Sequence, residues 1–247
     1  MQFDKDIPDY LHGEKFSNGL AIAISHSGEP VIDRFQIIES LCANKNIIHL
    51  GCVDHLPLIN KKIEQNIWLH ARLCKCANRC LGVDINGEGI NFIINNLGYN
   101  DVIYGNIMED DIEEIKNNKW DYLVLGEILE HVDDPCLFIS RIREKYQGNI
   151  DRIIVTVPNA FSWQNITYTF SHRECINTDH RFWFTPYTLA KVLSRANISV
   201  EQFYFCLPIN ENPNIFSRLL HPTLLFYNIL YSRYPATRQT LLMVAKI

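Results

Sequence analysis

The chain has 247 residues, of which 47% are hydrophobic and 21% charged, a composition typical of a globular protein with one large α/β core. Its formal net charge is −5 and it contains no run of lysine or arginine, which argues against a nucleic-acid partner because such proteins carry a basic stripe. No early segment joins a basic flank to an apolar stretch, and Asp4, Asp6 and Asp9 are wrong for one. We therefore expect a cytoplasmic protein.

The first 45 residues are weakly patterned and are predicted to form an N-terminal extension with one helix. The apolar residues 20–25 favour a strand, residues 27–30 a turn, and residues 31–41 the helix. A short apolar strand over residues 47–50 ends at Gly51. Isoleucines at helical spacing then predict one long helix over residues 57–79.

The rest of the chain alternates between apolar runs and helical patterns. Strands are expected at residues 80–85, 101–104, 122–125, 152–157, 199–207 and 240–247. Helices are expected at residues 89–97, 112–116, 135–146 and 186–196. This rhythm predicts right-handed βαβ units and an α/β fold with a parallel sheet. The irregular residues 159–179 follow a buried strand, where loops often carry specificity.

Residues 213–235 are rich in Leu, Phe and Tyr but are interrupted by proline. The apolar run is too short to cross a bilayer, so no transmembrane segment is expected. A lid helix, a homodimer face and a contact with a membrane surface all fit this pattern. A packed helix covering the sheet is the simplest interpretation.

Eight cysteines occur, and three of them, Cys74, Cys76 and Cys80, lie close together with His70 one helical turn upstream. Zinc sites usually show paired CxxC spacing, which is missing here. We interpret these cysteines as free thiols that pack a helix.

Two signals for a nucleotide occur at successive strand ends. Gly51, in IIHLGCVDH, would let the backbone approach a ligand closely. Asp84, in LGVDIN, can accept both ribose hydroxyls of an adenosine cofactor, although an aspartate here can also cap a helix. The two signals in succession favour a nucleotide.

The segment WDYLVLGEILEHVDDP runs from an apolar strand into an acidic turn. Glu127, Glu130 and His131 have the spacing i, i+3, i+4, which predicts that they share one helical face at the ligand-binding edge of the sheet. Such a cluster can bind a metal, move a proton or cap a helix.

In order, HLGCVDH, LGVDIN, YGNI, WDYLVLGEILEHVDDP and VTVPNAFS followed by DHRFWFTPYTL make residues 46–197 resemble the class I S-adenosylmethionine-dependent methyltransferases. The resemblance implies a Rossmann-like sheet with helices on both faces and an antiparallel last strand. It also implies that residues 46–247 form the methyltransferase domain, with a helical insertion at about 208–238. The implied contacts of S-adenosyl-L-methionine are Gly51, Cys52, Asp84, Ile85, Asn106, Ile107, Gly126 and Glu127.

The chain departs from the family pattern around the cofactor loop. His49 replaces the usual acidic residue, Val53 and His55 replace two loop glycines, and Asn106 replaces an aspartate. These losses keep open the alternative of a catalytically inactive methyltransferase-like binding subunit.

The resemblance implies roles for the acidic turn and for His180 of DHRFWFTP. His131 is expected to be the base because its unperturbed pKa lies near neutrality, and Glu127 is expected to contact the methionine amine. The segment is also similar to the metal-dependent small-RNA 2′-O-methyltransferases. By that similarity a divalent ion would be held by Glu127, Glu130, His131 and His180. In metal-free relatives these histidines hydrogen-bond substrate or backbone instead.

Together these observations predict an S-adenosylmethionine-dependent transferase that methylates a hydroxyl of a small molecule or of a sugar or glycan precursor. The alternative enzyme is a metal-dependent RNA ribose 2′-O-methyltransferase, against which the acidic charge balance weighs.

Overall fold

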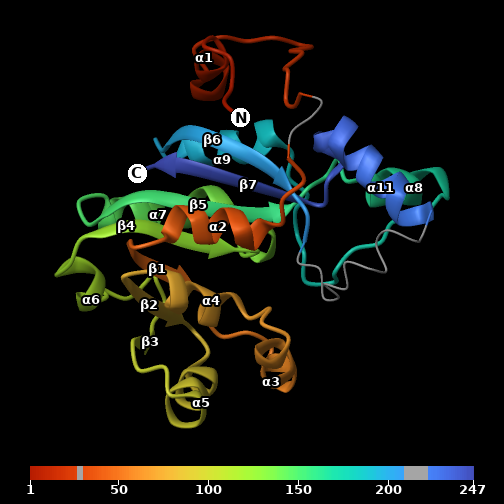
Figure 1. The fold of residues 1–247 in the computed structure, drawn as a ribbon. Coiled ribbons are helices and arrows are strands. Elements are labelled where there is room, and N and C mark those ends of the chain that lie inside the picture. The colour runs from red at the N-terminus through yellow and green to blue at the C-terminus, as the bar shows by residue number, and fades with distance from the viewer. Residues whose placement is uncertain (27–29, 209–221) are drawn as a thin grey trace.

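The computed structural model describes residues 1–26, 30–208 and 222–247. Within them the strands form one seven-stranded sheet in the order β3-β2-β1-β4-β5-β7-β6 (Figure 1). The strands are β1 (Asn46–Leu50), β2 (Arg79–Asp84), β3 (Val102–Tyr104), β4 (Trp120–Gly126), β5 (Ile150–Pro158), β6 (Ser199–Cys206) and β7 (Thr240–Lys246).

The described helices precede, connect and follow these strands. The α-helices are α1 (Ile7–His12), α2 (Arg34–Cys42), α3 (Leu56–Glu64), α4 (Leu69–Cys76), α5 (Gly87–Leu97), α6 (Glu113–Lys116), α7 (Pro135–Tyr146), α8 (Trp163–Phe170), α9 (Pro186–Arg195) and α11 (Pro222–Arg233). Two short 3₁₀ helices are η1 (Leu129–His131) and η2 (Pro235–Thr237).

The sheet is parallel from β3 to β5, and β7 runs antiparallel to both β5 and β6. This confirms the predicted Rossmann-like sheet with its antiparallel last strand. The strand order reverses between β1 and β4, so the loops after these strands diverge and leave room for a ligand. No described helix is long and apolar enough to cross a membrane.

Both faces of the sheet are covered, because the alternating apolar side chains of buried strands require a layer on each side. On one face α2 and α4 pack on the strands through Phe35, Ile38 and Leu73, and α2 lies in front of the strands in Figure 1. On the other face α7 and α9 pack through Ile139 and Leu189. The core thereby fixes the strand ends at which the candidate site is built.

Two predicted elements in the first part of the chain are wrong. Residues 20–25 form no strand: Leu20, Ile22 and Ile24 pack against the core from an extended segment that pairs with no described strand. The predicted helix over residues 57–79 is two helices, α3 and α4, because Asn66 adopts a left-handed φ of 55° between them. Most of the turn expected at residues 27–30 lies outside the described residues.

Two further helices were missed, α1 and α8. Helix α8 has no buried residue, so it leaves no apolar period in the sequence. Of the apolar segment 213–235, residues 213–221 lie outside the described part of the chain, and most of the remainder forms α11. Helix α11 lies beside α8 at one end of the sheet (Figure 1), with the Trp163 and Phe226 rings 6.3 Å apart.

Candidate functional site

The loop after β1 is built around Gly51, whose φ of 71° suits glycine. Its N–H donates to the Val83 carbonyl at 2.9 Å, and a Cβ here would lie 3.0 Å from Cδ1 of Ile128. The next residue, Cys52, turns its side chain into the core, and its carbonyl accepts a hydrogen bond from Nε1 of Trp68 at 3.1 Å. These contacts fix the conformation of the loop.

Asp84 ends β2 and ties this loop to the next one. Its carboxylate accepts from the Val53 N–H at 2.8 Å and from the Asn86 N–H at 2.9 Å. Burial raises the pKa of Asp84 despite these bonds. The cap of helix α5 is Asn86, whose side chain accepts from Gly89 N–H. The helix-cap interpretation of Asp84 is therefore wrong, and each of its oxygens keeps a lone pair for a ligand.

Two large apolar side chains are exposed beside Asp84. Ile85 is 69% exposed, and Tyr104, at the end of β3, is 65% exposed. Among the predicted cofactor residues nearby, Ile107 is buried, whereas the Asn106 side chain accepts from Met108 N–H at 3.0 Å. Tyr104 was not singled out from the sequence, although it lies in the YGNI segment. Its exposure at a strand end marks it as a surface for a flat ring.

Glu127 follows β4 in a left-handed conformation, with a φ of 57°. Such strain in a residue other than glycine is often found at functional sites. Its carboxylate forms an ion pair with Nη1 of Arg34 at 2.7 Å, a partner that no sequence pattern indicated. The neighbouring Gly126 packs tightly, since a Cβ there would lie 3.0 Å from Cδ2 of Leu69.

The expectation that Glu127, Glu130 and His131 share one helical face is wrong. Only residues 129–131 are helical, as the 3₁₀ turn η1, and the left-handed backbone of Glu127 precedes it.

The structure does bring Glu130, His131 and His180 together. One ligand-type atom from each lies within 4.8 Å of the other two, and the two imidazole rings meet edge to face with centroids 4.7 Å apart. The Arg181 N–H donates to the Glu130 carbonyl at 2.7 Å, which joins the segment after α8 to the acidic turn. Glu127 is the predicted ligand that lies outside this cluster.

Three buried polar atoms of this cluster lack partners within the described part of the chain. Both carboxylate oxygens of Glu130 and Nδ1 of His180 are buried without a hydrogen bond to any described residue. Burial raises the pKa of Glu130 to about 8, and the nearby Glu127 carboxylate adds to the shift. Burial and His131 together lower the pKa of His180. Buried polar groups of this kind are normally satisfied, so the residues fit a cation or a protonated carboxyl.

His131 has a defined tautomer. Its Nδ1 lies 3.2 Å from the Asp179 carbonyl oxygen, which can only accept. Nδ1 therefore carries the hydrogen, and Nε2 presents a lone pair that can take a proton or bind a metal.

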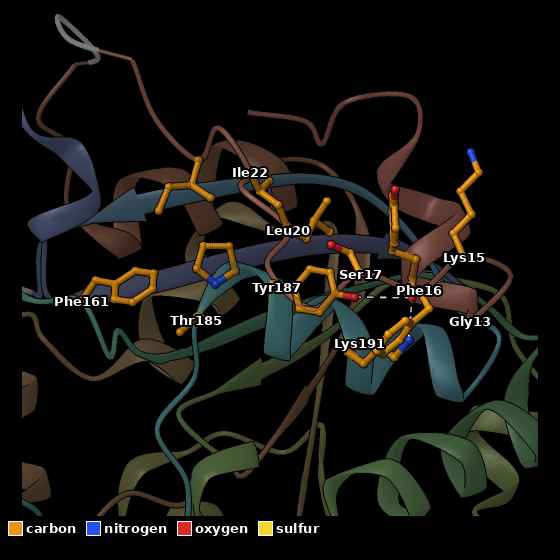
Figure 2. Close-up of a pocket in the computed structure, with 13 residues that line it drawn as sticks. Gly13, Lys15, Phe16, Ser17, Leu20, Ile22, Phe161, Thr185, Tyr187 and Lys191 are labelled. Carbon is orange, nitrogen blue, oxygen red and sulfur yellow. Dashed lines mark hydrogen bonds between the residues drawn. The ribbon is translucent and has the colours of Figure 1, made fainter.

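A cavity of about 630 Å³ lies between the N-terminal segment and α9 (Figure 2). Phe161 and Thr185 border one end of it and Lys15 the other. Lys191 closes one wall by donating to the Tyr10 and Leu11 carbonyls at 2.7 and 2.6 Å. No residue predicted for cofactor or metal lines this cavity. Thr185 is nonetheless only five residues after His180, a reach of at most about 17 Å.

The fold and these residues define an α/β protein with polar groups gathered at the carboxyl ends of parallel strands, and solved structures specify the kind of α/β fold. The small RNA methyltransferase HEN1 superposes with a TM-score of 0.53 and 16% identity, over 86% of this chain and 24% of that chain. An S-adenosylmethionine-dependent methyltransferase from Mesorhizobium loti superposes with a TM-score of 0.50 and 12% identity, over 86% and 95%. No protein-family model and no curated protein matches the sequence. The chain therefore has the fold of the S-adenosylmethionine-dependent methyltransferases.

Proposed function

We propose that this protein transfers the methyl group of S-adenosylmethionine to a hydroxyl oxygen of a small molecule or of a sugar or glycan precursor. The observation that carries the proposal is the convergence of Gly51, Asp84 and the acidic turn at the ends of β1, β2 and β4, in a fold shared with methyltransferases. In open α/β sheets this edge is where ligands bind.

The cofactor would lie across the ends of β1, β2 and β4. Gly51 offers a close backbone approach, and the free lone pairs of Asp84 would accept the ribose hydroxyls. Ile85 and Tyr104 are the exposed apolar surfaces on which adenine would stack. Glu127, which pairs with Arg34, would contact the methionine amine.

Methyl transfer is an in-line displacement: the acceptor oxygen forms a bond to the methyl carbon while the carbon–sulfur bond breaks and the sulfonium becomes a neutral thioether. The acceptor proton has to leave, and Nε2 of His131 would accept it, since Nδ1 carries the hydrogen donated to the Asp179 carbonyl. General-base catalysis of this kind contributes about 10²–10⁴-fold.

A divalent metal is the second element of the proposal. Glu130, His131 and His180 would hold it, because their buried oxygens and nitrogen lack partners among the described residues. When bound, such an ion lowers the pKa of a coordinated hydroxyl and orients it. A carboxylate with two imidazoles suits manganese, iron or zinc. His131 would then serve as a ligand, and the base function would pass to another group.

The acceptor would enter from the side of the cavity in Figure 2. Its volume of about 630 Å³ lies within the range of small-molecule pockets. Thr185 lines the cavity and lies five residues after His180 in the chain. The competing acceptor is an RNA ribose. The cluster of Glu130, His131 and His180 favours it, and HEN1, which has a similar fold, is a small RNA methyltransferase. The net charge of −5 weighs against an RNA acceptor.

Calorimetric titration with S-adenosylhomocysteine, the product form of the cofactor, tests cofactor binding. We expect saturable binding in wild type and a clear loss in Asp84→Ala, with Asp101→Asn as a control at an exposed carboxylate. No binding heat at high micromolar concentration would instead identify an inactive scaffold. Turnover with labelled cofactor on panels of sugars, small alcohols and short RNA then separates the acceptors.

A further inference from the structure

A second cluster of polar side chains lies buried between α4, β1 and β2 and takes no part in the proposed reaction. It consists of His49, His70, Cys74 and Cys80. His70 and Cys74 are one turn apart on α4, Cys80 is in β2 and His49 in β1. His49, His70 and Cys80 are buried and Cys74 is partly buried.

The imidazole of His70 is the centre of this cluster. Its Nδ1 lies 3.3 Å from Nδ1 of His49 and 3.8 Å from Sγ of Cys80. Its Nε2 lies 3.6 Å from Sγ of Cys74. One ligand-type atom each of His70, Cys74 and Cys80 lies within 4.8 Å of the other two.

These distances resemble those between ligands of one tetrahedral ion. Zinc bonds of about 2.0–2.1 Å to nitrogen and about 2.3 Å to sulfur place two nitrogens about 3.3 Å apart and a nitrogen and a sulfur about 3.6 Å apart. The two sulfurs approach different nitrogens of His70, so binding requires the ring to turn about its Cβ–Cγ bond. Two thiolates would also neutralise the charge of a divalent ion, and a buried ion needs this because an uncompensated buried charge is costly.

We propose that His70, Cys74 and Cys80 bind one zinc ion, and that His49, which contacts His70 but lies outside the group of three, moves to the fourth position. These side chains are buried apart from Cys74, which is partly buried, and such an enclosed set is typical of structural rather than catalytic zinc sites. The ion fastens α4 to β1 and β2. The inference does not depend on methyl transfer and holds for any activity of this fold.

The site lies directly beneath the loop after β1. A Cβ on Gly82 would lie 2.9 Å from Cε1 of His70 and 2.8 Å from Sγ of Cys52, so His70 and Cys52 converge on the same glycine. Trp68, immediately before α4, holds the Cys52 carbonyl. Zinc bound at α4 would therefore position the loop that carries Gly51 without contacting the molecule bound at the strand ends.

The test uses the full chain, purified with reductant and stripped of metal by a chelator. Cobalt(II) is the first probe, because a tetrahedral site with two thiolates gives a sulfur-to-cobalt charge-transfer band. We expect this band at one equivalent, its displacement by zinc, and its loss in Cys74→Ser. Zinc affinity measured against a chromophoric chelator should fall at least about a hundredfold in that variant. The matched control is Cys76→Ser, on the same helix and also partly buried but outside the cluster.

A second measurement needs no variant. Zinc should protect the partly buried Cys74 of the native protein from alkylation and leave Cys76 and Cys175 reactive, read by peptide mass spectrometry. Equal zinc affinity in Cys74→Ser and Cys76→Ser, or no protection by zinc in folded wild type, would overturn the proposal. A Cys74–Cys80 disulfide that forms under these reducing conditions would overturn it as well.

Discussion

Two histidine-containing clusters lie in different parts of the fold, one after β4 and one between α4, β1 and β2. They differ in ligand chemistry and in exposure to solvent. The cluster of Glu130, His131 and His180 combines a carboxylate with imidazoles, and both of its histidines are partly exposed at the ligand-binding edge of the sheet. The cluster of His70, Cys74 and Cys80 combines thiols with an imidazole under a helix. A carboxylate with imidazoles at a partly exposed edge suits a catalytic metal site, and thiolates in an enclosed site suit a structural one.

The largest effect in this comparison is expected from His131→Ala. Turnover should fall about 10²–10⁴-fold, because Nε2 of His131, the base proposed for the acceptor proton, is lost, while the dissociation constant of the cofactor stays nearly unchanged. Steady-state turnover and calorimetry measure the two quantities. His12→Ala, at an exposed histidine in the last turn of α1, is the control. Full activity in His131→Ala would exclude its role as base or ligand.

The Glu130 carboxyl is expected to make the stability of the folded protein depend on pH. Burial raises the pKa of Glu130 from its usual value of 4.5 to about 8, so the folded state holds the proton more tightly than the unfolded state. Stability of the metal-free protein should therefore fall as pH rises from about 4.5 to 8, by about 1.4 kcal/mol per unit of pKa shift as an upper bound. Urea unfolding at several pH values measures this.

Glu130→Gln should flatten that profile, and Glu64→Gln, at an exposed carboxyl, should leave it unchanged. Manganese should restore stability of the wild type at pH 8. A wild-type profile that is flat over this interval would contradict the buried, unpartnered state of the Glu130 carboxyl.

The clusters should lose metal independently. His180→Ala is expected to lower the affinity for manganese about a hundredfold and to leave zinc at the cysteine site. Cys74→Ser is expected to lower the affinity for zinc about a hundredfold and to leave manganese binding unchanged. Elemental analysis and competition with a chelator measure both. Loss of both metals in either variant would mean that the two sites are one cooperative unit or that the variant has unfolded, which circular dichroism distinguishes.

The smallest expected effect is that of Asp84→Asn. One oxygen acceptor remains, but the amide replaces the second acceptor that receives the Val53 or Asn86 N–H. We expect about a tenfold loss of cofactor affinity, equivalent to about 1.4 kcal/mol, from calorimetry. Unchanged affinity would place the ribose elsewhere.

Much of the fold could be predicted from the sequence because buried parallel strands are continuous apolar runs. All seven strands were expected within a few residues of their observed bounds, and helix α7 was predicted with both ends correct. The strand-end positions of Gly51 and Asp84 followed from the same pattern. Helices α1 and α8 were missed because α1 is short and α8 buries nothing.

The site was only partly predictable, because its decisive features are contacts between distant segments. His180 meets His131 across 49 positions, and only a family resemblance suggested it. Nothing local indicated that Arg34 would pair with Glu127, or that the left-handed backbone of Glu127 would remove it from the cluster. The thiol cluster was interpreted as helix packing because its spacing lacks CxxC pairs, whereas its geometry depends on how α4 lies on β2.

The sequence by itself determined the α/β alternation, the strand ends at which ligands bind and the residue types that gather there. These follow from hydrophobic periodicity and turn residues, which are local properties of the chain. The tertiary structure alone decided which ionisable groups meet, which are buried and which keep a free lone pair. Pairing and burial depend on the packing of helices across the sheet, and no local pattern encodes that packing.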